Sequence, residues 1–160
     1  MNSGKASSNT LKKQDACEVL SKEEVSSLLK VDINDLTQED MSFAENERRS
    51  ICHYVVKNGE IGSYNIRLSW KSDKAKANKV LEKSYSRYLS SGEKNMDSYE
   101  ELDNSNGTQI LFGTQKEDHG TTNYIIRKRF GNSAEVKIEV LTQNEAKELK
   151  SKLLKIINEL

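Results

Sequence analysis

Two cysteine-containing stretches decide how we expect this chain to fold: Asp15-Ala16-Cys17-Glu18-Val19-Leu20 and Ser50-Ile51-Cys52-His53-Tyr54-Val55-Val56. The first leads into a helix, because Ser21 and Glu24 follow it with the spacing of a capping box. The second is apolar on both alternating faces, which is typical of a strand covered on both sides. In an oxidising compartment the two cysteines would form a disulfide that fixes the helix on the sheet. In the cytosol they would be two separate buried thiols.

The composition indicates a folded domain without a strong preference for charged partners. The chain has 160 residues, of which 34% are hydrophobic and 31% are charged. Lys plus Arg and Asp plus Glu number 25 each, so we expect no general attraction to nucleic acid or to acidic lipid. The sequence also predicts no membrane-spanning helix, because it lacks a run of about 18 apolar residues.

The N-terminal residues differ in composition from the rest of the chain. Residues 1–13 are mostly polar and small and show no period, which predicts a flexible tether ahead of a single domain at residues 14–160. Such a tether is typical of the segment between a lipid-modified N-terminus and a folded domain. An ordinary frayed terminus has the same composition.

The middle of the chain predicts a hairpin and a long helix. Residues 51–56 and 64–70 flank an Asn-Gly dipeptide, which is well suited to a type I′ turn. Ser72 has a side chain suited to cap a helix that ends at Gly92. Residues 31–49 show no clear period, and we expect a loop with one irregular extended piece there.

The second half of the chain predicts a meander of strands followed by a final helix. A second capping box, Thr142 with Glu145, marks the start of that helix. The whole order predicts an α+β domain with a mostly antiparallel sheet and helices on both of its faces. The expected strands of the meander are residues 99–103, 108–113, 123–130 and 134–141.

Three segments carry a resemblance to a known family. Asp15–Val25 place a cysteine, two aliphatic residues and a serine ahead of a helix, and Cys52-His53-Tyr54 place a second cysteine near an aromatic residue. Gly131-Asn132 precede an alternating strand and a closing helix. In these segments the chain resembles small bacterial cell-envelope proteins, commonly lipoproteins, with a PsbP-like α/β/α sandwich. Residues 103–108 depart from the family's Gly-Asp-x-Ala segment.

The resemblance implies a structural disulfide between Cys17 and Cys52. It also implies export to the periplasm or cell surface, with tethering to the membrane through a lipid that this chain does not carry. It implies no catalytic residues, because the members of this family are mostly of unknown role.

The sequence shows no recognisable catalytic or metal-binding motif. His53 and His119 are its only histidines, and they lack the spacing of a metal site. Cys52 and His53 are adjacent in a predicted strand, where neighbouring side chains point to opposite faces, so adjacency does not make them a nucleophile and base. We therefore expect neither an enzyme nor a cofactor.

Arg127-Lys128-Arg129 form a positive cluster, with Tyr124 and Phe130 nearby. Such a strand could contact a phosphate, RNA or a protein partner, and these three residues are the candidate contact residues for a ligand or partner. We favour a basic outer face on a strand whose aromatic residues point inward. Lys128 interrupts that inward set, so we expect an edge strand or a bulge at this position.

These features predict a non-enzymatic, exported binding or scaffold domain of the bacterial cell envelope. Its partner would be another envelope protein or a small ligand, and we expect no nucleic acid. The alternative is a cytosolic interaction protein of the immunity type with two free thiols.

Overall fold

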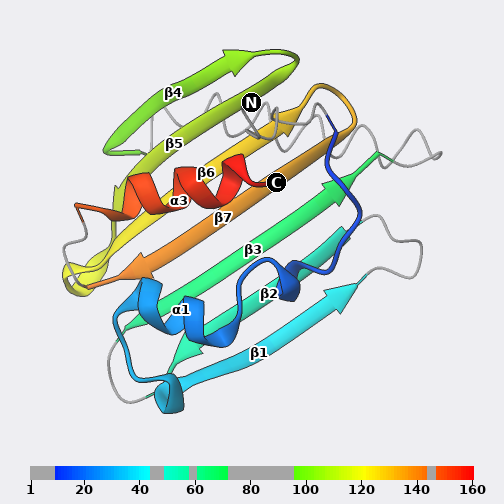
Figure 1. The fold of residues 1–160 in the computed structure, drawn as a ribbon. Helices are drawn as coiled ribbons and strands as arrows, with labels where there is room; N and C mark the ends of the chain where they lie inside the picture. Colours follow the sequence, from blue (N-terminus) through cyan, green and yellow to red (C-terminus); the bar gives the residue numbers. More distant parts are fainter. Residues whose placement is uncertain (1–9, 44–48, 58–60, 72–95, 144–146) are drawn as a thin grey trace, which may run out of the picture.

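One antiparallel sheet of seven strands forms the body of the described molecule (Figure 1). The computed structural model describes residues 10–43, 49–57, 61–71, 96–143 and 147–160. The strand order is β1-β2-β3-β7-β6-β5-β4. The strands are β1 (Leu36–Phe43), β2 (Arg49–Val56), β3 (Gly62–Trp70), β4 (Ser98–Ser105), β5 (Thr108–Lys116), β6 (Thr122–Phe130) and β7 (Ala134–Thr142). The helical elements are η1 (Ala16–Glu18), α1 (Lys22–Leu29), η2 (Ile33–Asp35), η3 (Asp118–Gly120) and α3 (Leu149–Asn158).

The last strand of the chain, β7, lies in the middle of the sheet between β3 and β6. Its register places Ile138 opposite Ile66 on β3 and opposite Ile126 on β6. Val136 lies opposite Leu68, and all five side chains are fully buried. β7 therefore joins the strands β1–β3 and β4–β6 into one continuous apolar core.

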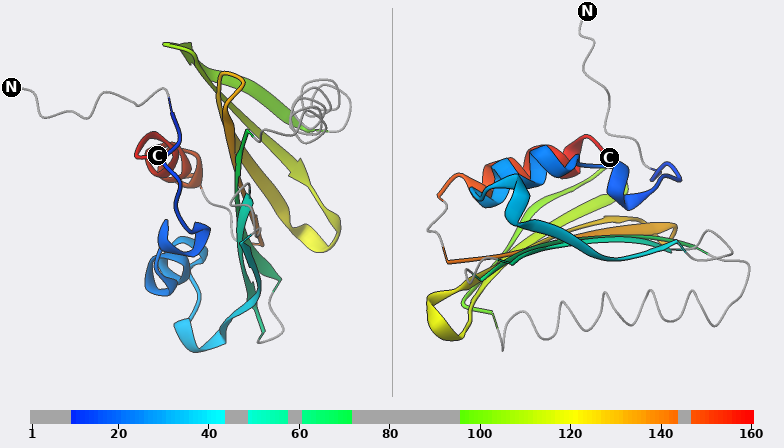
Figure 2. Two further views of the ribbon diagram at one scale, coloured as in Figure 1. Left: turned by 90° about the vertical axis from the view of Figure 1, so that its right-hand side faces the viewer. Right: turned by 90° about the horizontal axis from the view of Figure 1, so that it is seen from below.

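Both described α-helices cover the same face of the sheet (Figure 2). α1 buries Val25 and Leu29 against it, and α3 buries Leu149, Leu153 and Ile157. The prediction of an α+β sandwich with helices on both faces is therefore wrong. The described residues form a sheet-dominated domain with two short helices on one side.

The two edge strands of the sheet, β1 and β4, are irregular. β1 lies within residues 31–49, where we expected a loop with one irregular extended piece, and its register with β2 shifts between Gln38 and Asp40. β4 shows a similar shift between Glu101 and Asp103. A bulge moves the following side chains to the other face, so the alternation that marks a strand in the sequence is broken. Bulges and charged side chains on edge strands also oppose pairing with other chains.

Predictions for the hairpin and for the two later helices had different outcomes. The hairpin is confirmed, because β2 and β3 pair antiparallel with Cys52 opposite Ile66. The predicted helix at residues 72–92 lies outside the described residues, as does the Asn-Gly turn. The predicted start of the last helix is wrong, because α3 begins only at Leu149, with Glu148 as its N-cap residue. Thr142 is instead the last residue of β7 and pairs with Gly62 on β3, and Glu145 lies outside the described residues.

The N-terminal part of the described chain packs on the core. Leu11 is 6% exposed, and the indole Nε1 of Trp70 donates a hydrogen bond to the Leu11 carbonyl oxygen at 3.0 Å. The folded domain thus includes Leu11, which lies inside the stretch predicted to be a tether. Residues 1–9 lie outside the described residues.

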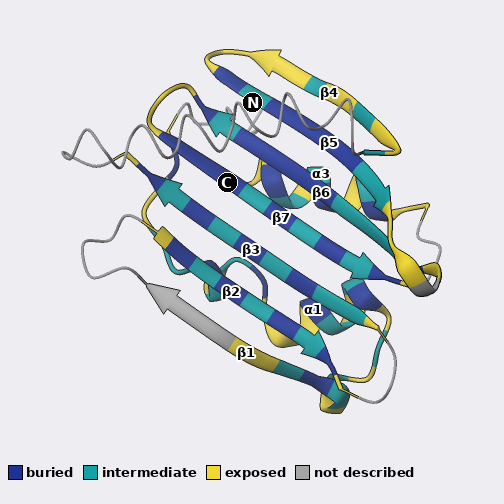
Figure 3. Ribbon diagram, turned by 180° about the vertical axis from the view of Figure 1, so that it is seen from behind, coloured by how far each residue is buried: buried dark blue, intermediate teal, exposed yellow. Residues whose placement is uncertain are grey.

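Along β2 and β3, buried residues alternate with half-buried residues (Figure 3), and the half-buried side chains face away from the helices. Leu111 and Ile125 form a small buried cluster on the face away from the helices, with Met96 and Tyr99 packed against it. The main core lies on the helical face, and the groove described next lies on that side.

Candidate functional site

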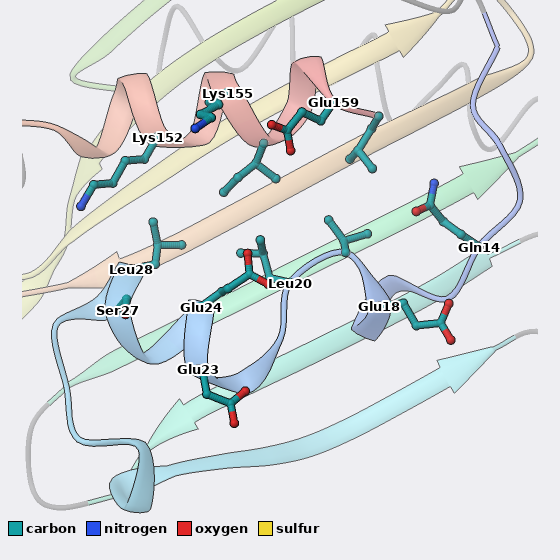
Figure 4. A pocket seen from close by; sticks show the side chains of 13 residues that line it. Gln14, Glu18, Leu20, Glu23, Glu24, Ser27, Leu28, Lys152, Lys155 and Glu159 are labelled. Atoms are coloured by element: carbon teal, nitrogen blue, oxygen red, sulfur yellow. The ribbon is translucent and has the colours of Figure 1, made fainter. Parts of the chain in front are cut away.

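A groove of about 710 Å³ lies between α1 and α3 on the helical face of the sheet (Figure 4). We call it the α1–α3 groove. Apolar side chains that are buried or half-buried form its floor, and exposed charged side chains dominate its walls. The floor consists of Val19, Leu20, Leu28, Ile156 and Leu160. The walls consist of Gln14, Glu18, Glu23, Glu24 and Ser27 on the η1–α1 side and Lys152, Lys155 and Glu159 on the α3 side.

The groove exists because the two helices pack on different strands. α1 packs on β3 and α3 packs on β6, while β7 lies between these strands in the sheet. Leu29 and Ile157 are buried in the core, whereas their neighbours Leu28 and Ile156 are only half-buried and line the groove. Each helix therefore has an apolar stripe wider than its contact with the sheet.

A disulfide and a buried hydrogen bond hold the η1 wall of the groove. Cys17 on η1 is bonded to Cys52 on β2, with a Cα–Cα distance of 5.1 Å. The Ala16 N–H donates a hydrogen bond of 2.8 Å to Ser50 Oγ, and both residues are buried. The predicted disulfide is confirmed, and it ties the wall that carries Glu18 covalently to the sheet.

The capping box predicted at the start of α1 is also confirmed. The Glu24 N–H donates to Ser21 Oγ at 3.1 Å, and the Ser21 N–H donates to Glu24 Oε1 at 3.0 Å. These bonds satisfy two backbone donors that the first helical turn leaves free. They also hold the Glu24 carboxylate at the edge of the groove.

The two walls of the groove differ in charge. The η1–α1 wall holds three carboxylates, whereas the α3 wall holds two lysines beside Glu159. All six charged residues are exposed, and Lys152 pairs with Glu148 at 3.7 Å. The groove therefore has an overall acidic character and a polarity from one wall to the other, which favours a cationic partner held in one orientation.

Two tyrosines beneath the α1 side of the groove are protonated at neutral pH. Burial raises the pKa of Tyr64, and the nearby Tyr54 and Glu24 raise it further. Burial and then Glu23 raise the pKa of Tyr54. The Tyr64 hydroxyl is buried without a hydrogen-bond partner among the described residues. Neither phenol supplies an ionised oxygen.

Arg127, Lys128 and Arg129 lie on β6, and they do not share one surface. Arg127 faces away from the helices, and its Nη1 donates to Glu135 Oε1 at 2.9 Å in a buried ion pair. Arg129 closes the β6–β7 turn, where its Nε donates to the Gly131 carbonyl oxygen at 2.7 Å. Lys128, between them in the sequence, lies on the helical side.

Lys128 is 1% exposed and sits in the core. Its Nζ donates to the Ile157 carbonyl oxygen at 3.5 Å and lies 4.8 Å from the centre of the Phe130 ring. Burial lowers the pKa of Lys128, and the charge of Asp103 opposes this shift. The expected edge strand or bulge is wrong, because β6 pairs in regular register with β5 and β7. The carbonyl groups in the last turn of α3 instead accommodate the cation.

A second, more polar pocket of about 460 Å³ lies on the face away from the helices. His53, Asn65, Asn123 and Glu139 contribute to its lining. Burial raises the pKa of Glu139, but hydrogen bonds from Lys137 and Asn123 and the charge of Arg127 outweigh it, so the pKa is below its ordinary value. Glu139 is therefore an ionised partner of Lys137.

The histidines are not brought together with other ligand-type side chains. His53 points away from its neighbour Cys52, whose side chain is in the disulfide on the helical face. His119 lies on η3, and its side chain is outside the described part of the structure. Within that part, no group of three His, Cys, Asp or Glu side chains is placed to hold a metal ion.

No protein-family model, curated protein or solved structure matches this chain. Among the described helices, none has the length and apolar character needed to cross a membrane. The disulfide is compatible with an extracytoplasmic location, because such bonds persist in oxidising compartments.

The sequence prediction did not include the α1–α3 groove. A signal for it is present in the two helical stripes, where Leu28 beside Leu29 and Ile156 beside Ile157 give more apolar surface than one sheet contact buries. The charges of the walls look like ordinary exposed helix residues until the helices are placed side by side.

Proposed function

We propose that this chain is a non-enzymatic, extracytoplasmic binding domain that holds its partner in the α1–α3 groove. The observation that carries the proposal is the accessible apolar floor beside a wall that a disulfide ties to the sheet. The groove volume of about 710 Å³ falls within the range of about 300–1,000 Å³ that is usual for ligand-binding clefts. A partner that covered the half-buried floor would remove apolar surface from water.

The disulfide and the composition of the N-terminal residues support the proposed compartment. An oxidised cysteine pair supports a place outside the cytoplasm, in the periplasm or at the cell surface. The polar composition of the residues ahead of Leu11 and the family resemblance add to this proposal a lipid anchor ahead of the domain, which would tether it to a membrane of the bacterial envelope. Incorporation of a labelled fatty acid into the protein in cells tests the anchor, and an unlabelled protein would contradict it.

The environment of the buried charged groups among the described residues supports a non-enzymatic role. Arg127 pairs with Glu135, and Lys128 lies against the last turn of α3. The half-buried Glu139 pairs with Lys137. These contacts stabilise the sheet and the helix on it, which gives each of these five charges a structural role.

Thiol counting tests the compartment. The protein is denatured directly from cells without a reducing agent and treated with a maleimide that adds mass to each free thiol. We expect no modified cysteine before reduction and modification of Cys17 and Cys52 after it. Two free thiols before reduction would contradict the proposal and favour the cytosolic immunity-type alternative.

Photo-crosslinking tests the groove. A photoreactive amino acid replaces Ser27, which is exposed on the α1 wall, or Glu117, which is exposed and outside the groove. We expect a discrete crosslinked species in cells from position 27 and none from position 117. Equal crosslinking at both positions, or none at position 27, would contradict binding in the groove.

A further inference from the structure

The length, the apolar floor and the charge of the α1–α3 groove indicate which kind of partner it binds. We infer that the partner presents a basic amphipathic helix. This inference rests on the proposed function, because it names what the same groove holds.

The groove is elongated along α3. Its lining includes Lys152 at one end and Leu160 at the other, with Ile156 between them. At 1.5 Å per residue this stretch of helix is about 12 Å long, or roughly two turns. A helix that lies in a groove of this length can place apolar residues at i, i+3, i+4 and i+7 along it.

The floor suits an apolar stripe and remains accessible to one. Four floor residues are half-buried: Val19 and Leu28 on the η1–α1 side, and Ile156 and Leu160 on the α3 side. In Figure 4 the labelled side chains of Leu20 and Leu28 lie in the space between α1 and α3. A convex partner fills this space, whereas a second copy of the domain would bring an equally concave groove.

The walls favour a basic helix in one orientation. Four carboxylates line the groove against two lysines, so a cationic partner gains more than it loses. Glu24 is already bonded to the Ser21 backbone. The exposed carboxylates of Glu18 and Glu23 lie on the outer side of the η1–α1 wall and point away from α3 (Figure 4), where they can meet lysine or arginine on the outward flank of the partner. Any acidic residues of the partner helix would lie on the flank that faces α3, opposite Lys155.

The surplus of carboxylates in the groove also favours a basic helix over an acyl chain as its occupant. A fatty acid would fill the apolar floor, but its carboxylate would face a groove with a surplus of carboxylates. A basic amphipathic helix uses both the floor and the walls. We therefore treat fatty-acid binding as an outcome that would overturn the inference.

The test is a selection of peptides on the whole chain with its disulfide intact. A displayed library of random peptides of about 18 residues is long enough to include helices that form on binding. We expect the enriched peptides to carry apolar residues with helical spacing and lysine or arginine along one flank. Their circular dichroism should become helical when they bind, and palmitate should not displace them.

Matched charge reversals locate the contact. The double variant Glu18→Lys/Glu23→Lys should weaken the enriched peptides about tenfold or more, because it replaces attraction by repulsion at two positions. The variant Glu117→Lys makes the same chemical change outside the groove and should leave Kd within about twofold. Thermal unfolding of each variant checks that it is folded.

Three results would overturn the inference. The enriched peptides could lack helical spacing, they could be acidic, or Glu18→Lys/Glu23→Lys and Glu117→Lys could change the Kd of the peptides equally. Displacement of the peptides by palmitate, or a dimer lost on Glu18→Lys/Glu23→Lys, would also overturn it. If crosslinking from position 27 still occurs, the proposed function stands and only the helical partner is wrong. If that crosslinking is absent as well, both fail.

Discussion

Lys128 carries a charge in a place where most proteins hold an apolar side chain. Its ammonium lies 3.5 Å from the Ile157 carbonyl oxygen and 4.8 Å from the centre of the Phe130 ring. A carbonyl near the C-terminal end of a helix and an aromatic face both attract a cation. They replace only part of the water that the amine loses on burial, so its pKa is lowered.

Replacing Lys128 with methionine should change the pH dependence of stability. Between the lowered pKa of the folded state and the ordinary value of 10.5, the unfolded chain binds a proton that the folded chain has released. The free energy of unfolding of the wild type therefore rises with pH in that window. Lys128→Met lacks this rise and should be about 1 kcal/mol more stable at neutral pH.

Urea unfolding from about pH 7 to about pH 9.5 measures the effect. Tyr54 and Tyr64 are present in both proteins and make the same contribution to each curve, so the difference between the two curves isolates Lys128. Lys155→Met removes an exposed lysine and should keep the wild-type slope. Parallel curves for wild type and Lys128→Met would show that burial of Lys128 does not destabilise its charged form.

At the scale of elements, α1 is a helix that cannot be stable by itself. It has eight residues, and isolated helices shorter than about 12–15 residues are marginal in water. Its capping box satisfies the first turn, and Lys30 ends the helix in the left-handed conformation with φ of 57°. Val25 and Leu29 then hold it on the sheet. The position of the acidic wall depends on these contacts.

Ser21→Ala should lower the free energy of unfolding by about 1 kcal/mol, because it removes the acceptor for the Glu24 N–H. Ser27→Ala makes the same chemical change at an exposed position of α1 and should cost nothing, since alanine favours helix. Urea unfolding of both variants measures the difference. Equal stabilities would mean that the capping box does not stabilise α1.

At the scale of the whole molecule, two long-range connections make one domain of the described elements. β7 inserts between β3 and β6, which joins strands distant in the sequence. The disulfide links residues that are 35 positions apart and fastens η1 to β2. The first connection forms the core, and the second fixes the wall of the groove on it.

Removing the disulfide with Cys17→Ser/Cys52→Ala should lower the free energy of unfolding by about 3–4 kcal/mol, as expected for a loop of this length. The wild type unfolded in the presence of a reducing agent should show the same loss. Coincident urea unfolding curves for the oxidised wild type and the double variant would contradict the prediction. Peptides selected on the oxidised protein should also bind the variant more weakly, because η1 carries part of the groove.

Features that depend on residues close together in the chain could be predicted from the amino-acid sequence. Ser21 and Glu24 form their capping box, and residues 51–56 and 64–70 form their hairpin. In each case the interacting groups are set by local spacing and side-chain chemistry. The Cys17–Cys52 disulfide was an inference from the family resemblance, and the structure contains it.

Only the tertiary structure decided the features that depend on which distant segments meet. The bulge in β1 breaks its strand pattern, so the sequence predicted only an irregular extended piece there, and the insertion of β7 has no local signature. The placement of both described helices on one face, the burial of Lys128 and the α1–α3 groove all follow from that strand order. A periodic pattern shows which face of an element is apolar, but the partner that covers this face is chosen by packing across the whole fold.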